Sequence, residues 1–128
     1  MARPEVSHHE NIVRAIHSAW WDIHANRGFS SVFKGQNNSV SRLSILNLTQ
    51  LFEIFHTELD SSPNGQIVGA GEINVGRLIE IGQQHIKPIE LTVEEAPLPE
   101  NRAHAEIPQK ISKGLANSII RELSFHKS

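Results

Sequence analysis

Apolar residues recur along this chain at two different spacings, and each spacing predicts a different element. Between positions 48 and 59 they follow one another at intervals of three and four residues, as on the buried face of an α-helix. Asn47 precedes this helix as its N-cap, and the polar segment 60–65 is a stop and turn signal. Pro108 suits the first turn of a final helix, whose inner face carries apolar residues as far as Leu123. The pattern therefore predicts at least two amphipathic helices.

Alternation of apolar and polar residues predicts strands in other segments. Positions 87–95 alternate most cleanly, and the glycine-rich segment 66–73 also suits a strand, followed by a short helix at 74–81. The mixed pattern of 29–46 suits a strand or an extended loop. Segment 11–24 fits a helical stripe, the interpretation that we favour, but its first half could equally be a short strand followed by a loop. Together these elements predict an α+β domain with a small mixed or antiparallel sheet packed by two or three helices.

Length and composition place these elements in one domain. The chain has 128 residues, of which 38% are hydrophobic and 20% charged, as in a globular domain that buries its own core. Residues 1–10 are polar, and we expect a flexible tail there, ahead of a single compact domain over residues 11–128. We expect no signal peptide, because the N-terminal segment lacks an apolar core, and no membrane span. A cytoplasmic protein is the simplest interpretation.

Charge and cysteine content narrow the possible chemistry. The net charge of −2, with the histidines neutral, argues against strong non-specific binding of phosphates, although a local basic face remains compatible with it. The 8 histidines make the net charge sensitive to mild acidification. The chain has no cysteine, which excludes disulfides, thiolate metal sites and cysteine nucleophiles.

The segment 99–110 contains the densest group of chemically active residues. His104 and Glu106 form the first half of a zinc deaminase signature, in which a histidine ligand precedes a catalytic glutamate. The second half needs a Cys-x-x-Cys pair that this chain lacks, so we reject a deaminase. No His-x-x-x-His pair occurs, and the glycines between 69 and 76 fit neither a P-loop nor a dinucleotide fingerprint. We therefore expect no metal and no cofactor.

A general acid–base site is a more open hypothesis. In an extended segment His104 and Glu106 project from the same face, and His17 and Arg42 could meet them in three dimensions. Histidine can transfer protons near neutral pH, and arginine or lysine can stabilise a phosphate or carboxylate oxyanion. The simpler interpretation, which we prefer, is that His104 and Arg42 hydrogen-bond loop backbone and hold the fold. The candidate catalytic residues are His17, Arg42, His104 and Glu106, and the candidate substrate- or phosphate-binding residues are Ser39, Arg102 and Lys110.

Two further groups of residues could contact partners. The basic residues at the last helix would form a nucleic-acid-facing edge only if Arg42 or Arg102 lay close by, and an ordinary solvated face is the simpler interpretation. Trp20 and Trp21 cannot both be buried on one helix face, so one packs in the core and the other is a candidate contact with a protein partner or a second copy. The basic residues concerned are Lys110, Lys113, Arg121 and Lys127.

Four short motifs carry a resemblance to a known group of proteins. They are Ile16-His17, Ser30-Ser31-Val32-Phe33, Ser39-Val40-Ser41-Arg42-Leu43 and Asn101-Arg102-Ala103-His104-Ala105-Glu106-Ile107. Their order resembles that of small, stand-alone bacterial proteins of unassigned function with Ser-Ser-x-x-Phe, here one residue shorter, Ser-Val-x-Arg and Asn-Pro-Ala-His-Ala elements. This chain departs from that pattern at Arg102, where proline is usual, and at Pro108, where glycine is usual. The resemblance implies a bacterial source and a single-domain product, but no activity.

Two functions fit these observations. Small size, mild charge, incomplete catalytic signatures and surplus aromatics favour a cytosolic binding or adaptor module of a larger bacterial assembly, for example a defence or conflict system. The alternative is a metal-independent hydrolase or transferase acting on RNA or a nucleotide, with His104 and His17 as proton carriers and Arg42 or Lys110 binding phosphate. The enzyme requires His17, Arg42 and His104 in one concave pocket. The adaptor predicts that they are satisfied internally, beside a flat apolar patch.

Overall fold

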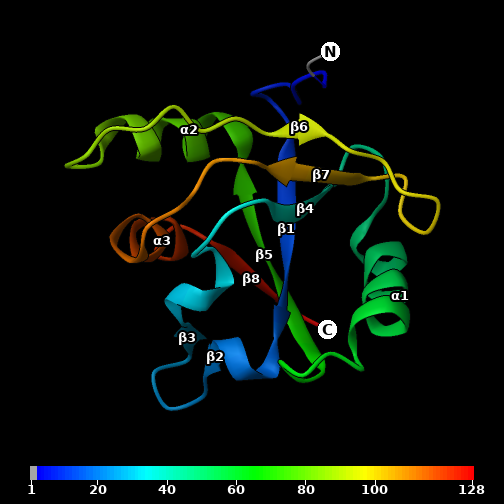
Figure 1. The fold of residues 1–128 in the computed structure, drawn as a ribbon. Coiled ribbons are helices and arrows are strands. Elements are labelled where there is room, and N and C mark those ends of the chain that lie inside the picture. The colour runs from blue at the N-terminus through cyan, green and yellow to red at the C-terminus, as the bar shows by residue number, and fades with distance from the viewer. Residues whose placement is uncertain (1–2) are drawn as a thin grey trace.

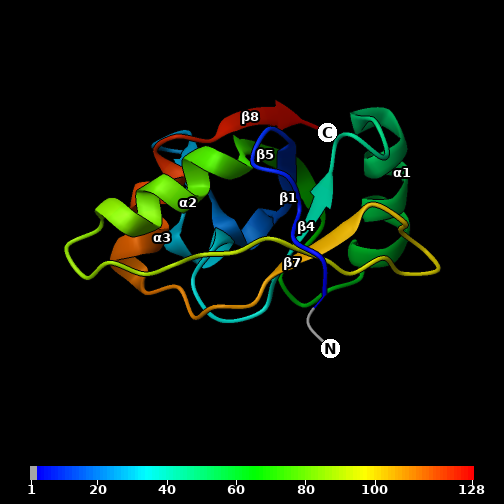
Figure 2. The same ribbon diagram turned by 90° about the horizontal axis from the view of Figure 1, so that it is seen from above.

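The computed structural model describes residues 3–128 and shows one antiparallel sheet with helices on both faces (Figure 1, Figure 2). In this part of the chain the main sheet has six strands in the order β6-β7-β4-β1-β5-β8, and β2 and β3 form a separate hairpin. This confirms the predicted α+β class, with three α-helices and antiparallel pairing throughout. The strands are β1 (Asn11–His17), β2 (Trp21–Asp22), β3 (Arg27–Gly28), β4 (Asn38–Arg42), β5 (Ile67–Asn74), β6 (Glu94–Glu95), β7 (His104–Ile107) and β8 (Ser124–Lys127). The helices are α1 (Leu48–Leu59), α2 (Val75–Gln84) and α3 (Lys113–Ile120), with 3-10 turns at Ser18–Trp20 and Ser30–Val32.

Residues 11–17 form the central strand β1, so the helix that we favoured there is wrong and the alternative strand is confirmed. Ile12 and Ile16 are buried on the face that α2 and α3 cover, whereas Val13 is buried on the face that α1 covers. A strand that is covered on both faces is apolar on both faces, so its sequence loses the strict alternation that distinguishes a strand from a helix.

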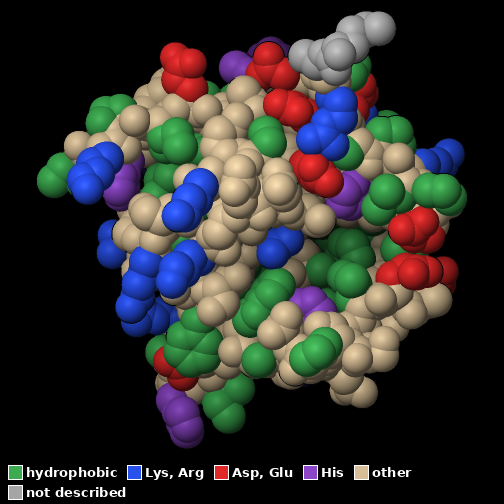
Figure 3. Space-filling model, in the orientation of Figure 1, with side chains coloured by type: hydrophobic (Ala, Val, Ile, Leu, Met, Phe, Trp, Pro, Cys, Tyr) green, Lys and Arg blue, Asp and Glu red, His purple; other side chains and the backbone are tan. Residues whose placement is uncertain are grey.

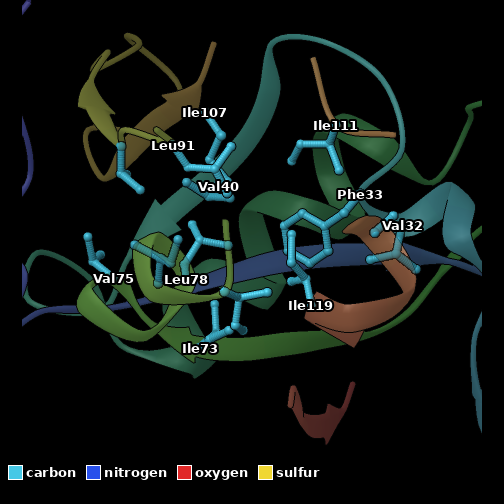
Figure 4. Packing of buried hydrophobic residues seen from close by; sticks show 14 of the residues in the cluster. Val32, Phe33, Val40, Ile73, Val75, Leu78, Leu91, Ile107, Ile111 and Ile119 are labelled. Atoms are coloured by element: carbon cyan, nitrogen blue, oxygen red, sulfur yellow. The ribbon is translucent and has the colours of Figure 1, made fainter. Parts of the chain in front are cut away.

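Two hydrophobic clusters join the layers. The larger lies between the sheet and the pair α2 and α3, and Figure 4 shows side chains from these elements and from a 3-10 turn pointing toward one another. The smaller lies between the sheet and α1. Pairing between β1 and β5 moves from Ile16–Gly69 to His17–Ile67, which leaves Val68 as a bulge. The bulge lets Val68 pack on the larger cluster and Ile67 on the smaller.

The helix ends show which local signals hold. α1 begins with a capping box at Asn47, as predicted. α3 is capped by Ser112 instead of beginning at Pro108, because Ile111 is still held in an extended bridge to Gly35. The chain after α3 turns into the edge strand β8, which the sequence pattern did not indicate.

Residues 3–10 differ from the flexible tail that their composition predicts. Val6 is 2% exposed and belongs to the larger cluster, and Glu10 forms an ion pair with Arg42. Ion pairs from Arg3 and backbone hydrogen bonds to the neighbouring strand segments add to these two contacts, so this short polar segment is fixed against the sheet. Residues 1–2 of the predicted tail lie outside the described residues. Within residues 3–128 no helix has the length and apolar character needed to cross a bilayer.

Candidate functional site

A cleft opens where β1 and β4 separate. The two strands pair only at Ile12–Arg42 and Val13–Ser41, although both continue past these pairs. The space between them is a cleft of about 250 Å³ whose walls also come from α1 and from the loop before β7. Figure 3 shows a hollow near the centre of this face. The lining residues that matter below are Arg14, His17, Trp20, Ser39, Asn101 and His104.

Arg14 lies in the gap between the two strands. Its Nε donates to the carbonyl oxygen of Val32, and its Nη1 donates to that of Ser39 at 2.7 Å. The guanidinium also lies over the rings of Trp20 and Phe33, at 5.1 and 5.9 Å from their centroids. Burial lowers the pKa of Arg14 to about 10, so the group remains protonated at neutral pH.

No carboxylate forms an ion pair with Arg14 among the described residues. The carbonyl oxygens and ring faces around Arg14 are neutral, and the second terminal nitrogen, Nη2, makes no hydrogen bond within residues 3–128. No buried side-chain nitrogen in that range lacks a partner, so Nη2 is open to the cleft that Arg14 lines. The cleft therefore contains a fixed guanidinium without a direct ion-pair partner in the described part of the chain, although the carboxylates of Glu58 and Glu100 also line it.

His17 and His104 line the same cleft, and both are held through Nδ1. The His17 Nδ1 donates to the carbonyl oxygen of Gly65 at 2.8 Å, and the His104 Nδ1 donates to that of Ala96 at 2.7 Å. Because a carbonyl oxygen only accepts, each neutral ring carries its hydrogen on Nδ1 and leaves Nε2 as an acceptor. The hydrogen bond from His104 to loop backbone is the contact that the structural interpretation predicts, and within residues 3–128 its Nε2 makes no hydrogen bond.

The sheet register separates the two histidines. His104 lies opposite Ser41, Ser41 lies opposite Val13, and His17 follows Val13 along β1. Two strand spacings across and about four residues along the sheet place the two Cα atoms roughly 15 Å apart. The histidines therefore mark opposite ends of the cleft and do not form a proton-transfer pair around one atom.

Arg42 does not line the cleft. Its Nε and Nη2 donate to both oxygens of the Glu10 carboxylate, at 2.9 and 2.7 Å, and its Nη1 donates to Glu95 at 2.7 Å. The hydrogen bond from Arg42 holds the pKa of Glu10 below its ordinary value, and the same bond raises the pKa of Arg42. Arg42 thus holds the fold as we expected, but through carboxylates and not through loop backbone.

The other predicted residues divide between the cleft and the surface. Ser39 lines the cleft and supplies its carbonyl oxygen to Arg14. Glu106 projects from the same face of β7 as His104, but it forms an ion pair with Arg3 at 3.0 Å. Arg102 and Lys110 are exposed and do not line the cleft. The two tryptophans lie in different sites. Trp20 contacts Arg14, whereas Trp21 lines a separate groove.

Sequence reasoning missed Arg14 and Asn101. A strand places Arg14 on the same face as Ile12 and Ile16, and a charge between two buried isoleucines is the signal that could have found it. The helix that we favoured instead placed Arg14 on the solvent side. Asn101 is 6% exposed and donates to the Ser41 hydroxyl at 3.0 Å, a contact across the sheet that spacing alone does not predict.

The described residues contain no group of three histidine, aspartate or glutamate side chains placed to hold a metal ion. In comparisons with known proteins, no family model matches the chain, and no curated protein or solved structure is significantly similar to it. The resemblance in four short motifs stays a prediction. Function has to be argued from the chemistry of the cleft.

Proposed function

We propose that the protein is a binding module whose cleft takes a carboxylate carried on an apolar group of a partner protein. The single observation that supports this proposal is the buried guanidinium of Arg14, which lines a cleft and has no ion-pair partner within residues 3–128. A charge withdrawn from water without a counter-charge is costly, and an anionic ligand relieves that cost. Arginine is also the side chain whose planar fork best matches a carboxylate or phosphate oxygen.

The rest of the lining favours a singly charged ligand with an apolar body. Glu58 and Glu100 lie exposed along the cleft and would repel a phosphate dianion more than a carboxylate. Ile54, Phe55 and Leu98 supply apolar surface beside them. A cleft of about 250 Å³ has room for one side chain or one chain end. A peptide that ends in an apolar residue with a free carboxylate combines these properties.

Such a ligand fits the adaptor role that the composition favours. Chain ends and acidic side chains are presented by proteins, so the module would join a larger bacterial assembly in the cytoplasm by capturing one of them. The specificity would come from the charge, and the affinity from burial of the apolar group.

A pair of short peptides tests this function. The two peptides end in the same leucine, one with a free carboxylate and one with an amide, and tryptophan fluorescence reports binding because Trp20 contacts Arg14. We expect the free acid to bind at least about tenfold more tightly, the value of one charged hydrogen bond. Arg14→Lys should weaken this preference and Arg14→Met should abolish it, while Arg102→Gln, an exposed cation outside the cleft, should leave it unchanged.

Equal affinity of the wild-type protein for the acid and the amide would contradict the proposal. Tighter competition by inorganic phosphate than by the free acid would move the ligand class to phosphate esters. These outcomes separate the charge of the ligand from its shape.

The second candidate is the hydrolase or transferase acting on RNA or a nucleotide, and the free Nε2 of His104 in the same cleft as Arg14 favours it. In this version Arg14 binds the phosphate in place of Arg42, and His104 transfers the proton alone because His17 is too distant. A dinucleotide and bis(4-nitrophenyl) phosphate are suitable substrates, with His104→Ala as the inactive variant. Wild-type turnover no faster than the buffer background would eliminate this candidate.

A further inference from the structure

A second groove, of about 680 Å³, lies between α3 and the β2–β3 hairpin. Ile16 and Gly71 of the sheet lie at its base, and Leu123 and Phe125 line it from the end of the chain. The groove and the Arg14 cleft share no lining residue, so they are two distinct sites.

Aromatic rings line this groove and are partly open to solvent. Trp21 stacks on Phe125 with ring centroids 4.1 Å apart and planes tilted by 21°. Phe29 is 46% exposed and Phe125 is 39% exposed. Phe33 and Phe55 are buried, so large exposed rings gathered in one groove stand apart from them and mark a surface that stacks on a ligand.

Positive charge accompanies the rings. Arg27 of the hairpin, Lys113 of α3 and Arg121 at the C-terminal cap of α3 line the groove, and none of the three forms an ion pair within residues 3–128. Figure 3 shows lysine and arginine side chains gathered on this side of the molecule. Asp22 is the acidic residue among those that line the groove, and its carboxylate accepts hydrogen bonds from the backbone N–H groups of His24 and Ala25 in the hairpin turn.

We propose that this groove binds single-stranded nucleic acid, a function beyond the carboxylate site. Bases stack on the exposed rings, and phosphates contact the three cations, the combination that proteins use for unpaired strands. A duplex hides the faces of its bases and cannot use the rings. The sequence allowed a nucleic-acid-facing edge at the last helix only if Arg42 or Arg102 lay close by. Neither residue lines the groove, and Arg27 supplies the additional cation instead.

Fluorescence anisotropy with a labelled oligouridylate of about ten nucleotides measures this binding. Three phosphate contacts predict a slope of roughly −2 in a plot of log affinity against log salt, a loss of about 20-fold between roughly 50 and 200 mM salt. Arg121→Gln should lower the slope to about −1.4, so that the same salt change costs only about sevenfold. Arg102→Gln is the matched control, because Arg102 is an exposed cation outside the groove.

Phe29→Ala tests the stacking separately from the charge. Loss of one stacked base predicts about tenfold weaker binding of the oligouridylate with an unchanged salt slope. Ile86→Ala, which truncates another exposed apolar residue outside the groove, should have no effect. Arg14→Met should also leave this binding intact, so failure here and failure of the carboxylate site are distinguishable.

Three results would overturn the proposal. The first is the absence of binding at millimolar protein and low salt. The second is equal affinity for inorganic polyphosphate of the same charge, and the third is equal affinity for an RNA duplex of the same length. Either of the last two would show that the rings contribute nothing to recognition.

Discussion

Arg14 and Arg42 occupy neighbouring strands and have opposite surroundings. Arg42 is enclosed by the carboxylates of Glu10 and Glu95, which neutralise it and fix the N-terminal segment on the sheet. Arg14 has only neutral carbonyl oxygens and ring faces around it, and one of its nitrogens is open to a cleft. Arginine thus stabilises the fold through ion pairs at position 42, whereas at position 14 it has no ion-pair partner within residues 3–128 and can bind a ligand. Residue type does not distinguish the two roles, but the charge of the neighbours does.

Removing each arginine should have very different effects on stability. Arg42→Met leaves Glu10 and Glu95 close together without their cation, and we expect the free energy of unfolding to fall by about 3 kcal/mol. Arg14→Met removes hydrogen bonds to two carbonyl oxygens but also removes an unbalanced charge, so we expect a loss below about 1.5 kcal/mol. Urea unfolding of both variants measures this difference. Equal losses would mean that the charge of Arg14 is already compensated in the free protein.

Acid should act on the Arg42 region and not on Arg14. The pKa of Glu10 lies below its ordinary value of 4.5, so its contribution to stability is complete above that pH and is lost as the pH falls through the lowered value. The pKa values of Asp60 and Glu122 are also lowered, by the Ile67 N–H group and by Arg77, and they add to the same loss. The free energy of unfolding of wild type and Arg42→Met, measured between neutral and acidic pH, isolates the pH-dependent contribution of Glu10. We expect this contribution to be smaller than the loss caused by Arg42→Met itself.

The pH-dependent contribution of Glu10 to stability should vanish in Arg42→Met and persist in Arg14→Met. A wild-type pH profile that Arg42→Met reproduces without change would show that Glu10 gains nothing from this pair.

The smallest expected effect concerns what holds Arg14 in place. Its guanidinium lies 5.1 Å from the centroid of the Trp20 ring, close enough for a cation–π interaction. A double-mutant cycle of Arg14→Met and Trp20→Leu should give a coupling free energy of roughly 0.5–1 kcal/mol. Additive losses within experimental error would show that the ring only fills space.

The α+β class of the fold could be predicted from the sequence, but the site only in part. In both cases the outcome depended on whether local sequence signals were sufficient to identify the element concerned. α1 has one buried face and a capping box at Asn47, so spacing and cap agree. β1 is buried on both faces, and its pattern cannot distinguish strand from helix until the neighbours on each side are known. The error on β1 hid Arg14, because a helix turns it to solvent. Local signals thus determine α1, whereas the central strand with its charge and the edge strand β8 are determined by tertiary pairing.

The candidate residues follow the same rule. His104 and Ser39 were found because both lie in polar segments that draw attention by themselves. Arg42 was assigned to the wrong place because its partner Glu10 belongs to a segment that composition marks as loose. Glu106 became a candidate because of its spacing from His104. That spacing correctly predicts that both side chains project from one face of a strand, but it does not predict the ion pair between Glu106 and Arg3.

The central position of β1 also determines when the sheet can form during synthesis. Asn11 and Asn74, at one end of the β1–β5 ladder, are 63 positions apart, and the contact from His17 to Gly65 spans 48. At about 5–20 residues per second, a ribosome needs several seconds to deliver β5 after β1 has emerged. During that time the edge of β1 that pairs with β5 stays unpaired, and only β4 can pair with the other edge, the condition under which nascent chains associate with one another or with chaperones. The strand that is most protected in the finished molecule is thus the most vulnerable one in the growing chain.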